Sequence, residues 1–131
     1  MMSMISTPVS YGEILDKITI LEIKAVNIKD VEKQKNVKHE LVILQDTWDK
    51  YVAASDEINT LKQQLKKVNQ DLWNIEDNIR IKESKKEFDD EFIQIARSVY
   101  FENDTRATVK KEVNLLLGSE LIEEKSYQDY S

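Results

Sequence analysis

The chain has no cysteine, one proline and two glycines among its 131 residues. Without cysteine there is no disulfide, thiol nucleophile, zinc–thiolate site or iron–sulfur cluster. Turns need glycine and proline at particular backbone positions, so their scarcity disfavours a β fold with many turns and favours a few long helices. The length suits one hydrophobic core. We therefore expect a single all-α domain over residues 1–131.

Long hydrophobic runs are missing as well. Residues 1–9 combine neither a basic start nor a sustained apolar stretch, so we interpret them as a short lead-in and not as a signal peptide. No run of about 18 apolar residues predicts a membrane span. The lack of cysteine fits a reducing compartment. We expect a cytoplasmic protein that has no membrane partner.

Charge of both signs is abundant, with 25 acidic residues, 19 lysines and arginines and a formal net charge of −6. A nucleic-acid partner requires clustered lysine and arginine to displace counterions. Here the lysine groups are interleaved with acids, which is typical of a solvated helix face. We therefore expect no nucleic-acid partner.

Apolar residues spaced three and four positions apart predict four helices. Ser10 and Asp30 are suitable N-caps, either Ser55 or Asp56 caps the next helix, and Gly118 is a suitable helix stop. The predicted helices span residues 10–29, 30–51, 55–84 and 87–117. An acidic tail follows over residues 119–131.

The third predicted helix has the most regular pattern. From Ile58 to Ile79 an apolar residue recurs at alternating spacings of three and four, which is the repeat of a coiled coil. A matching seam runs from Phe88 to Leu116. These seams predict an up-down helical bundle built on a long antiparallel coiled-coil-like hairpin, with the first two helices packed against it. The hairpin outreaches those helices, and a homodimer would cover the remaining apolar stripe.

Polar residues interrupt the second seam near its middle. The Asn103-Asp104 pair is able to cap a new helix, so residues 87–117 form either one helix or two. Folding the hairpin back about residue 86 sets Asn69 opposite roughly residue 103. The polar layer would then contain Asn69, Glu102, Asn103 and Arg106, with Arg106 paired to Glu102 or Asp104 because a buried unpaired charge is costly.

The sequence is compatible with two interpretations of this polar layer. It fixes the pairing register, as a buried asparagine does in coiled coils, or it is an anion-binding or catalytic pocket centred on Arg106. Glu13 and Asp16 add to the candidate site because their helix carries apolar residues on several faces. In that setting Asp16 and Lys17 would form a buried pair.

Catalytic machinery is sparse. The only histidine, His39, lies between Lys38 and Glu40 on a polar helix face, so a nucleophile lacks its usual base. The glycines are isolated, which excludes a phosphate-cradling glycine loop. Carboxylates three residues apart can share a magnesium ion, but an acidic helical protein contains such pairs by chance. We predict no catalytic residue, no metal site and no cofactor.

Four phrases resemble a family of short bacterial proteins of unknown function. They are PVSYGEILDKITILEIK at 8–24, LWNIED at 72–77, NDTRA at 103–107 and LLLGSELIEEKSY at 115–127. The resemblance covers essentially the whole chain, and it implies no activity that carries over. It does imply that the polar phrases are family positions.

The leading functional hypothesis is a non-catalytic helical interaction or assembly protein, partnered by itself and by another cytoplasmic protein. The alternative is a binding protein or enzyme for a nucleotide or sugar phosphate, using a polar pocket. The residues of that candidate pocket are Glu13, Asp16, Lys17, Asn69, Glu102, Asn103, Asp104 and Arg106.

Overall fold

A computed structural model describes residues 3–131, and in this range it has four helices and no strand. The helices are α1 (Tyr11–Asn27), α2 (Val31–Tyr51), α3 (Asp56–Ser84) and α4 (Asp90–Leu117). The prediction of an all-helical fold is confirmed for this part of the chain. The first two residues of the expected lead-in lie outside the described residues.

Each helix begins at a side chain that accepts a hydrogen bond from the first helical turn. Ser10 accepts from the Glu13 N–H at 3.1 Å. Asp30 and Ser55 cap α2 and α3 in the same way, as their residue types predict. Each such cap contributes about 1 kcal/mol, so the helix starts are largely local properties of the sequence.

Two helix boundaries differ from the prediction by two to three residues. α1 ends at Asn27 instead of 29, because Ile28 has an extended backbone. Gln34 ties the link to α2 by donating a hydrogen bond to the Ala25 carbonyl at 2.7 Å. α4 begins at Asp90 instead of 87, since Lys86 adopts a left-handed backbone with φ of 56° and Asp89 supplies the cap.

α4 is one continuous helix through Asn103 and Asp104, which answers the question of one helix or two. Its end also departs from the predicted seam. Leu116 is largely exposed, and Leu117 packs against the core in its place. Gly118 then ends the helix in the left-handed conformation, with φ of 66°.

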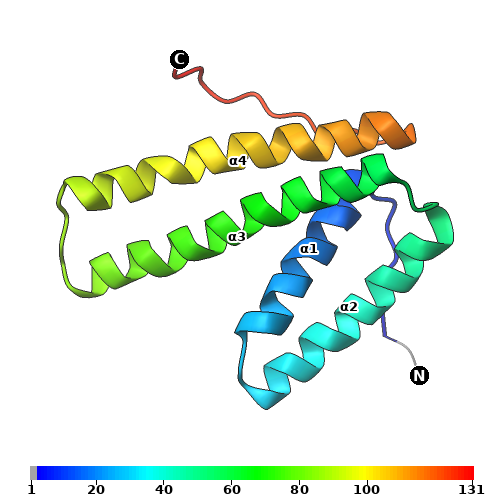
Figure 1. The fold of residues 1–131 in the computed structure, drawn as a ribbon, viewed down its shortest axis with the longest axis horizontal. Coiled ribbons are helices and arrows are strands. Elements are labelled where there is room, and N and C mark those ends of the chain that lie inside the picture. The colour runs from blue at the N-terminus through cyan, green and yellow to red at the C-terminus, as the bar shows by residue number, and fades with distance from the viewer. Residues whose placement is uncertain (1–2) are drawn as a thin grey trace.

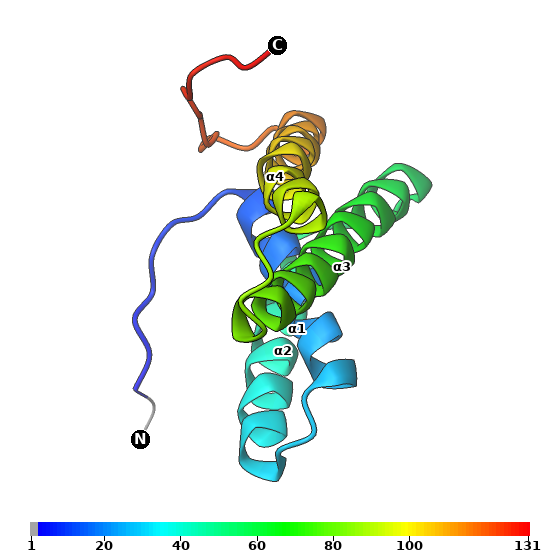
Figure 2. The ribbon, with the colours of Figure 1, turned by 90° about the vertical axis from the view of Figure 1, so that its left-hand side faces the viewer.

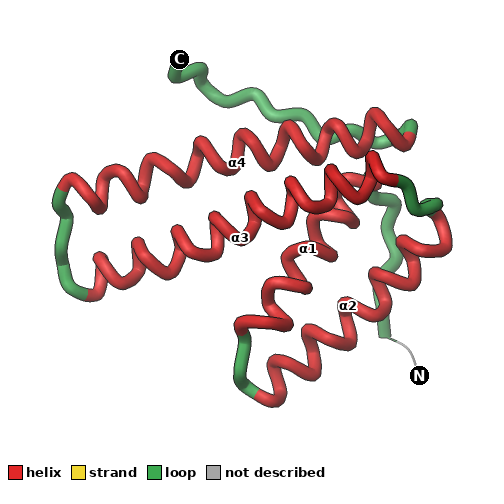
Figure 3. The backbone as a smooth tube through the Cα atoms, in the orientation of Figure 1, coloured by secondary structure: helices red, strands yellow, loops and turns green. Residues whose placement is uncertain are grey.

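The helices form two hairpins that cross (Figure 1). α1 contacts α2, α3 and α4, and α3 lies against α4. Figure 3 shows the short links within each hairpin. Seen from the tip of the α3–α4 hairpin in Figure 2, α1 and α2 run across the direction of the other pair. The expected helical bundle is thus a pair of crossed hairpins. Both of the first two helices are predicted to pack against the longer hairpin, but only α1 lies directly against it, and α2 lies against α1.

The hydrophobic core lies at this crossing. Leu15 and Ile18 of α1 meet Leu65 of α3 and Val113 of α4, and all four side chains are nearly inaccessible to solvent. Burial of such a side chain contributes about 1.5–3 kcal/mol, so the crossing is the most stabilised part of the fold. Within the described residues, none of the helices is both long and apolar enough to cross a membrane.

Candidate functional site

A buried carboxylate lies where α1 crosses the α3–α4 hairpin. Asp16 is 1% exposed. Arg106 of α4 donates two hydrogen bonds to it, from Nε to Oδ1 at 2.9 Å and from Nη2 to Oδ2. Asn69 of α3 donates to the same Oδ1, also at 2.9 Å. The Asp16 side chain of α1 is therefore hydrogen-bonded to both helices of the α3–α4 hairpin.

Thr19 completes this arrangement one turn along α1. Its hydroxyl donates to the Asp16 carbonyl at 2.8 Å and accepts from Asn69 Nδ2 at 2.9 Å. We call Asp16, Thr19, Asn69 and Arg106 the crossing cluster. A forked arginine–carboxylate pair is strong and directional, and the loss of one partner leaves a buried charge. The crossing cluster therefore joins α1, α3 and α4 in one geometry.

The charge of Arg106 is reinforced by its surroundings. Its hydrogen bonds to Asp16 raise the arginine pKa, against the opposing effect of burial, and the negative charges of Asp16, Glu13 and Glu123 act in the same direction. The Arg106 side chain keeps 29% of its exposure. Arg106 is thus permanently charged and partly accessible.

A second ion pair lies one turn further along α4. Lys110 is buried, and its Nζ is 2.9 Å from Glu13 Oε2 and 3.5 Å from Glu123 Oε2. Burial favours the neutral form of Glu123, but the charges of Lys110 and Lys125 outweigh it and lower the pKa of Glu123. The start of α1 and the tail are both tied to α4 through Lys110.

The start of α1 also touches the backbone of α4 directly. A Cβ at Gly12 would lie 2.4 Å from the Lys110 carbonyl oxygen. The Gly12 N–H donates to Asn114 Oδ1 at 2.7 Å, and Asn114 is fully buried. Position 12 therefore needs glycine for close approach, and Asn114 satisfies an N–H that α1 itself leaves unpaired.

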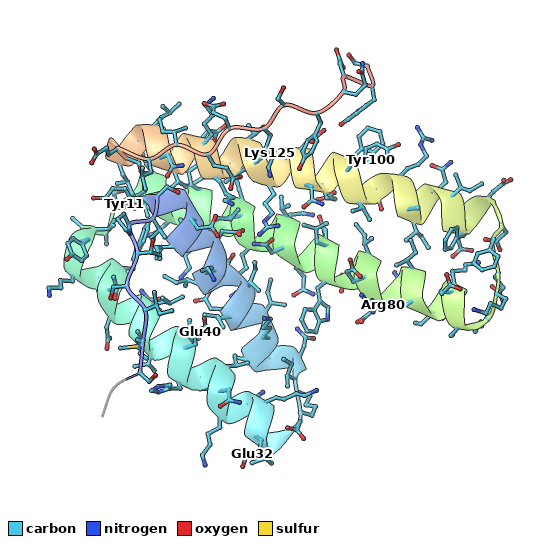
Figure 4. The ribbon with its side chains drawn as sticks, turned by 180° about the vertical axis from the view of Figure 1, so that it is seen from behind. Tyr11, Glu32, Glu40, Arg80, Tyr100 and Lys125 are labelled. Carbon is cyan, nitrogen blue, oxygen red and sulfur yellow. The ribbon has the colours of Figure 1, made fainter. Side chains whose placement is uncertain are left out.

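The tail, residues 119–131, runs back along α4, as Figure 4 shows near the labelled Lys125 and Tyr100. It bounds a groove of about 970 Å³ beside the crossing cluster. Val99, Asn103, Arg106 and Ala107 of α4 line one side of this groove, and the tail lines the other. The groove gives solvent its access to Arg106.

Four of the predicted site residues come together. Glu13, Asp16, Asn69 and Arg106 lie at the crossing, in the cluster or in the adjoining ion pair. Asn103 and Asp104 line the groove instead.

Two predicted pairings are wrong. Arg106 binds Asp16 and neither Glu102 nor Asp104, because α1 inserts its own carboxylate between the helices of the hairpin. Lys17 is exposed and takes part in no ion pair among the described residues. Arg106, and not Lys17, is the ion-pair partner of Asp16. Glu102 is half-buried and likewise makes no ion pair within residues 3–131. The register of the α3–α4 hairpin cannot predict this contact, because α1 crosses the hairpin and does not run along it.

Several residues at the crossing escaped the sequence reasoning. Lys110 and Asn114 lie four and eight residues after Arg106, on the same helix face. This spacing of four residues is the feature of the sequence that predicts a shared face of α4 for all three polar side chains. Thr19 follows Asp16 by three residues and has the same kind of signal. Glu123 lies on the tail, where no periodicity exists.

The crossing cluster is saturated with internal bonds. Each carboxylate oxygen of Asp16 accepts from Arg106, and Asn69 divides its amide between Asp16 and Thr19. Among the described residues no group of three or more His, Asp and Glu side chains is placed to hold a metal ion. The arrangement is suited to holding helices together, and only its Arg106 edge faces a groove.

These features define a small all-helical protein in which a buried polar cluster locks two crossed hairpins. The chain belongs to the family of unknown function DUF6165, whose match spans residues 5–130. Membership of a family of unknown function is thus confirmed, while its bacterial origin and the particular phrases stay predictions. Comparison with curated proteins and with solved structures found no match in either set.

Proposed function

We propose that this protein is a non-catalytic helical interaction protein of the cytoplasm. We further propose that it forms a homodimer through the projecting half of the α3–α4 hairpin. We call that half, residues 72–99, the projecting arm. The observation that carries the proposal is the incomplete burial of the apolar seam along this arm.

The seam changes its environment along α3. Leu65, at the crossing, is 0% exposed, whereas Leu72 is only partly buried. Figure 1 shows the reason, since α1 and α2 lie at one end of the hairpin, and beyond the crossing α3 and α4 lie against each other without a further layer. Two helices cannot enclose an apolar seam, and a second copy would supply the missing layer. Other seam residues of the arm are equally half-buried, namely Ile75, Ile79, Phe92, Ile95 and Val99.

Charge at the tip of the arm supports a second copy as the occupant. Arg80 lies in the last turns of α3, Lys85 and Lys86 follow the end of that helix, and the start of α4 carries Asp90 and Glu91. A two-fold axis would place the basic side of one arm on the acidic side of the other. Figure 4 shows Arg80 on this projecting part, away from α1 and α2.

The self-contained crossing cluster supports a non-catalytic role. A general base must be able to reach a substrate proton, whereas Asp16 is enclosed and bonded on both oxygens. The buried lysine at position 110 is likewise held between two carboxylates. These groups serve the fold.

The test is the mass of the protein in solution as a function of concentration. We expect a dimer by light scattering or sedimentation at micromolar concentration. Ile81→Glu combined with Ile93→Glu should convert it to a monomer, because both side chains are about half exposed on the arm and cost the monomer little. Val42→Glu, at an equally exposed apolar position on α2, is the matched control and should leave the dimer intact. A wild-type monomer throughout would refute the homodimer.

A small-molecule site is the second candidate, favoured by the groove beside Arg106. Its cations are already matched by internal carboxylates, since Arg106 binds Asp16 and Lys110 binds Glu13. A bound phosphate would have to compete with these pairs. A thermal-shift screen with nucleotides, sugar phosphates and divalent metals tests it, and a stabilisation that Asn103→Ala removes would favour this candidate over the first.

A further inference from the structure

We propose that the tail is a tethered occupant of a docking surface on α4, and that this surface binds an acidic, tyrosine-bearing extended segment of a partner protein in the tail's place. The docking surface consists of Tyr100, Phe101, Asp104, Lys110 and Lys111. The inference rests on the proposed interaction role but uses a different surface from the projecting arm, so the two can fail separately.

Charge complementarity holds the first part of the tail. Lys111 Nζ lies 3.1 Å from Glu124 Oε1, and the adjacent Lys110 Nζ lies 3.5 Å from Glu123 Oε2. The tail as a whole contains four acids and one lysine. Two successive lysines on α4 thus pair with two successive glutamates of the extended tail.

An aromatic contact holds the far part of the tail. The ring of Tyr130 lies 5.1 Å from that of Tyr100 and 5.2 Å, edge-on, from that of Phe101. Its hydroxyl donates a hydrogen bond to Asp104, which raises the pKa of Tyr130 to about 12. Paired aromatic rings of this kind attract each other beyond the effect of the area that they bury. Tyr130 is therefore the aromatic anchor of the far part of the tail.

These contacts are suited to exchange. Residues 120–131 form no regular secondary structure, and most of their side chains are exposed, including Tyr127 at 77%. The Lys111–Glu124 pair is exposed, and such pairs are individually weak. Between the two anchors the tail spans the groove of about 970 Å³ without filling it. A competing segment needs only to repeat the anchors and to fill more of this space.

The anchors specify the chemistry of the partner. It must present two neighbouring carboxylates for Lys110 and Lys111, and a tyrosine six residues after the second one, as Glu124 and Tyr130 do here. It must also be extended, because these contacts spread along α4 from position 111 back to position 100. This is recognition of an acidic motif by a basic-aromatic surface.

The experiment uses the full-length chain and a fluorescent peptide with the sequence of residues 119–131. In the protein, Glu124→Ala with Tyr130→Ala removes one anchor at each part of the tail. We expect this tail-released protein to bind the peptide roughly tenfold more tightly than wild type does, because the tethered tail no longer competes. A peptide carrying Glu124→Ala and Tyr130→Ala is the control and should not bind. Circular dichroism checks that both proteins are equally helical.

A charge swap tests the docking register. Lys111→Glu in the tail-released protein should weaken binding about threefold, in keeping with an exposed ion pair, and a Glu124→Lys peptide should restore it. Equal affinity for wild-type and tail-released protein would overturn the proposal. So would binding that Lys111→Glu leaves unchanged, since that result means that Glu124 of the peptide does not dock on Lys111. A concentration-dependent dimer that Tyr130→Ala abolishes would replace the partner segment by tail exchange between copies.

Discussion

α3 passes through two regions that share one sequence pattern and differ in physical character. At the crossing, Leu65 is enclosed by side chains of three helices, while one heptad later, on the arm, Leu72 is only partly covered. Heptad spacing decides which face of the helix is apolar. Whether that face is buried depends on how many other helices reach it. An unbroken apolar seam therefore does not imply a continuous core.

Polar residues differ between the two regions in the same way. At the crossing, Arg106 and Asp16 are bonded in a site that excludes most solvent. At the tip of the arm, Lys82 lies 2.9 Å from Asp89 in a group of ion pairs whose acidic partners are well exposed. Surface pairs contribute little, whereas breaking a buried pair is costly. The same residue chemistry therefore has unequal consequences for stability.

The largest expected effect comes from Asp16→Ala. It removes the carboxylate that pairs the half-buried Arg106 and one of the two acceptors of the buried Asn69 amide, so we expect a loss of about 3–5 kcal/mol in the free energy of unfolding. Urea denaturation followed by circular dichroism measures it. Lys17→Ala, at the exposed neighbouring position, should stay within about 0.5 kcal/mol of wild type. A loss below about 1 kcal/mol for Asp16→Ala would show that the crossing cluster is not structural.

A matched pair of leucines tests the comparison directly. Leu65→Ala should cost about 2–5 kcal/mol because it opens a cavity in a closed core. Leu72→Ala, in the same seam one heptad later, should cost about 1 kcal/mol in the monomer, since solvent already reaches that site. Both values come from urea denaturation at a concentration where the protein is monomeric. Equal losses would mean that the arm is as well enclosed as the crossing.

Gly12→Ala should cost about 1–3 kcal/mol, because the new methyl group would displace the Lys110 backbone and force α1 from α4. Gly118→Ala is the control, because its destabilisation has a different physical cause. It meets no atom within 4 Å, and its cost of about 1 kcal/mol comes from the left-handed backbone alone. Thermal unfolding of the two variants compares them. If Gly12→Ala is as stable as wild type, the close approach of α1 to α4 is not as described.

The smallest expected effect concerns pH. The pKa of Glu123 is lower in the folded chain, so its ion pair with Lys110 stabilises the fold above the unfolded value of 4.5 and is lost as pH falls through the folded pKa. We expect wild type to exceed Glu123→Gln by a few tenths of a kcal/mol near neutral pH. The difference should vanish in acid and shrink in high salt. A difference that is constant with pH would show that the charge of Glu123 is not involved.

The helices and their apolar faces could be predicted from the sequence because their causes are local. N-cap side chains, heptad spacing and the glycine stop act within a few residues of the position that they control. Ser10, Asp30 and Ser55 therefore cap the predicted helices. Folding the predicted hairpin back about residue 86 also places Asn69 in one polar layer with Arg106. Helix boundaries shifted by two or three residues where a backbone turn or another cap competed.

The sequence pattern does not specify which chain segments meet, and this depends on the tertiary packing. Asp16 and Arg106 are 90 residues apart, and no periodicity links one helix with another that crosses it at a steep angle. Whether Asp16 or Lys17 is buried depends on how α1 is rotated about its axis. Because α1 carries apolar residues on several faces, its sequence pattern does not fix this rotation. Local propensity forms the helices, and the requirement that every buried charge be paired selects how they cross.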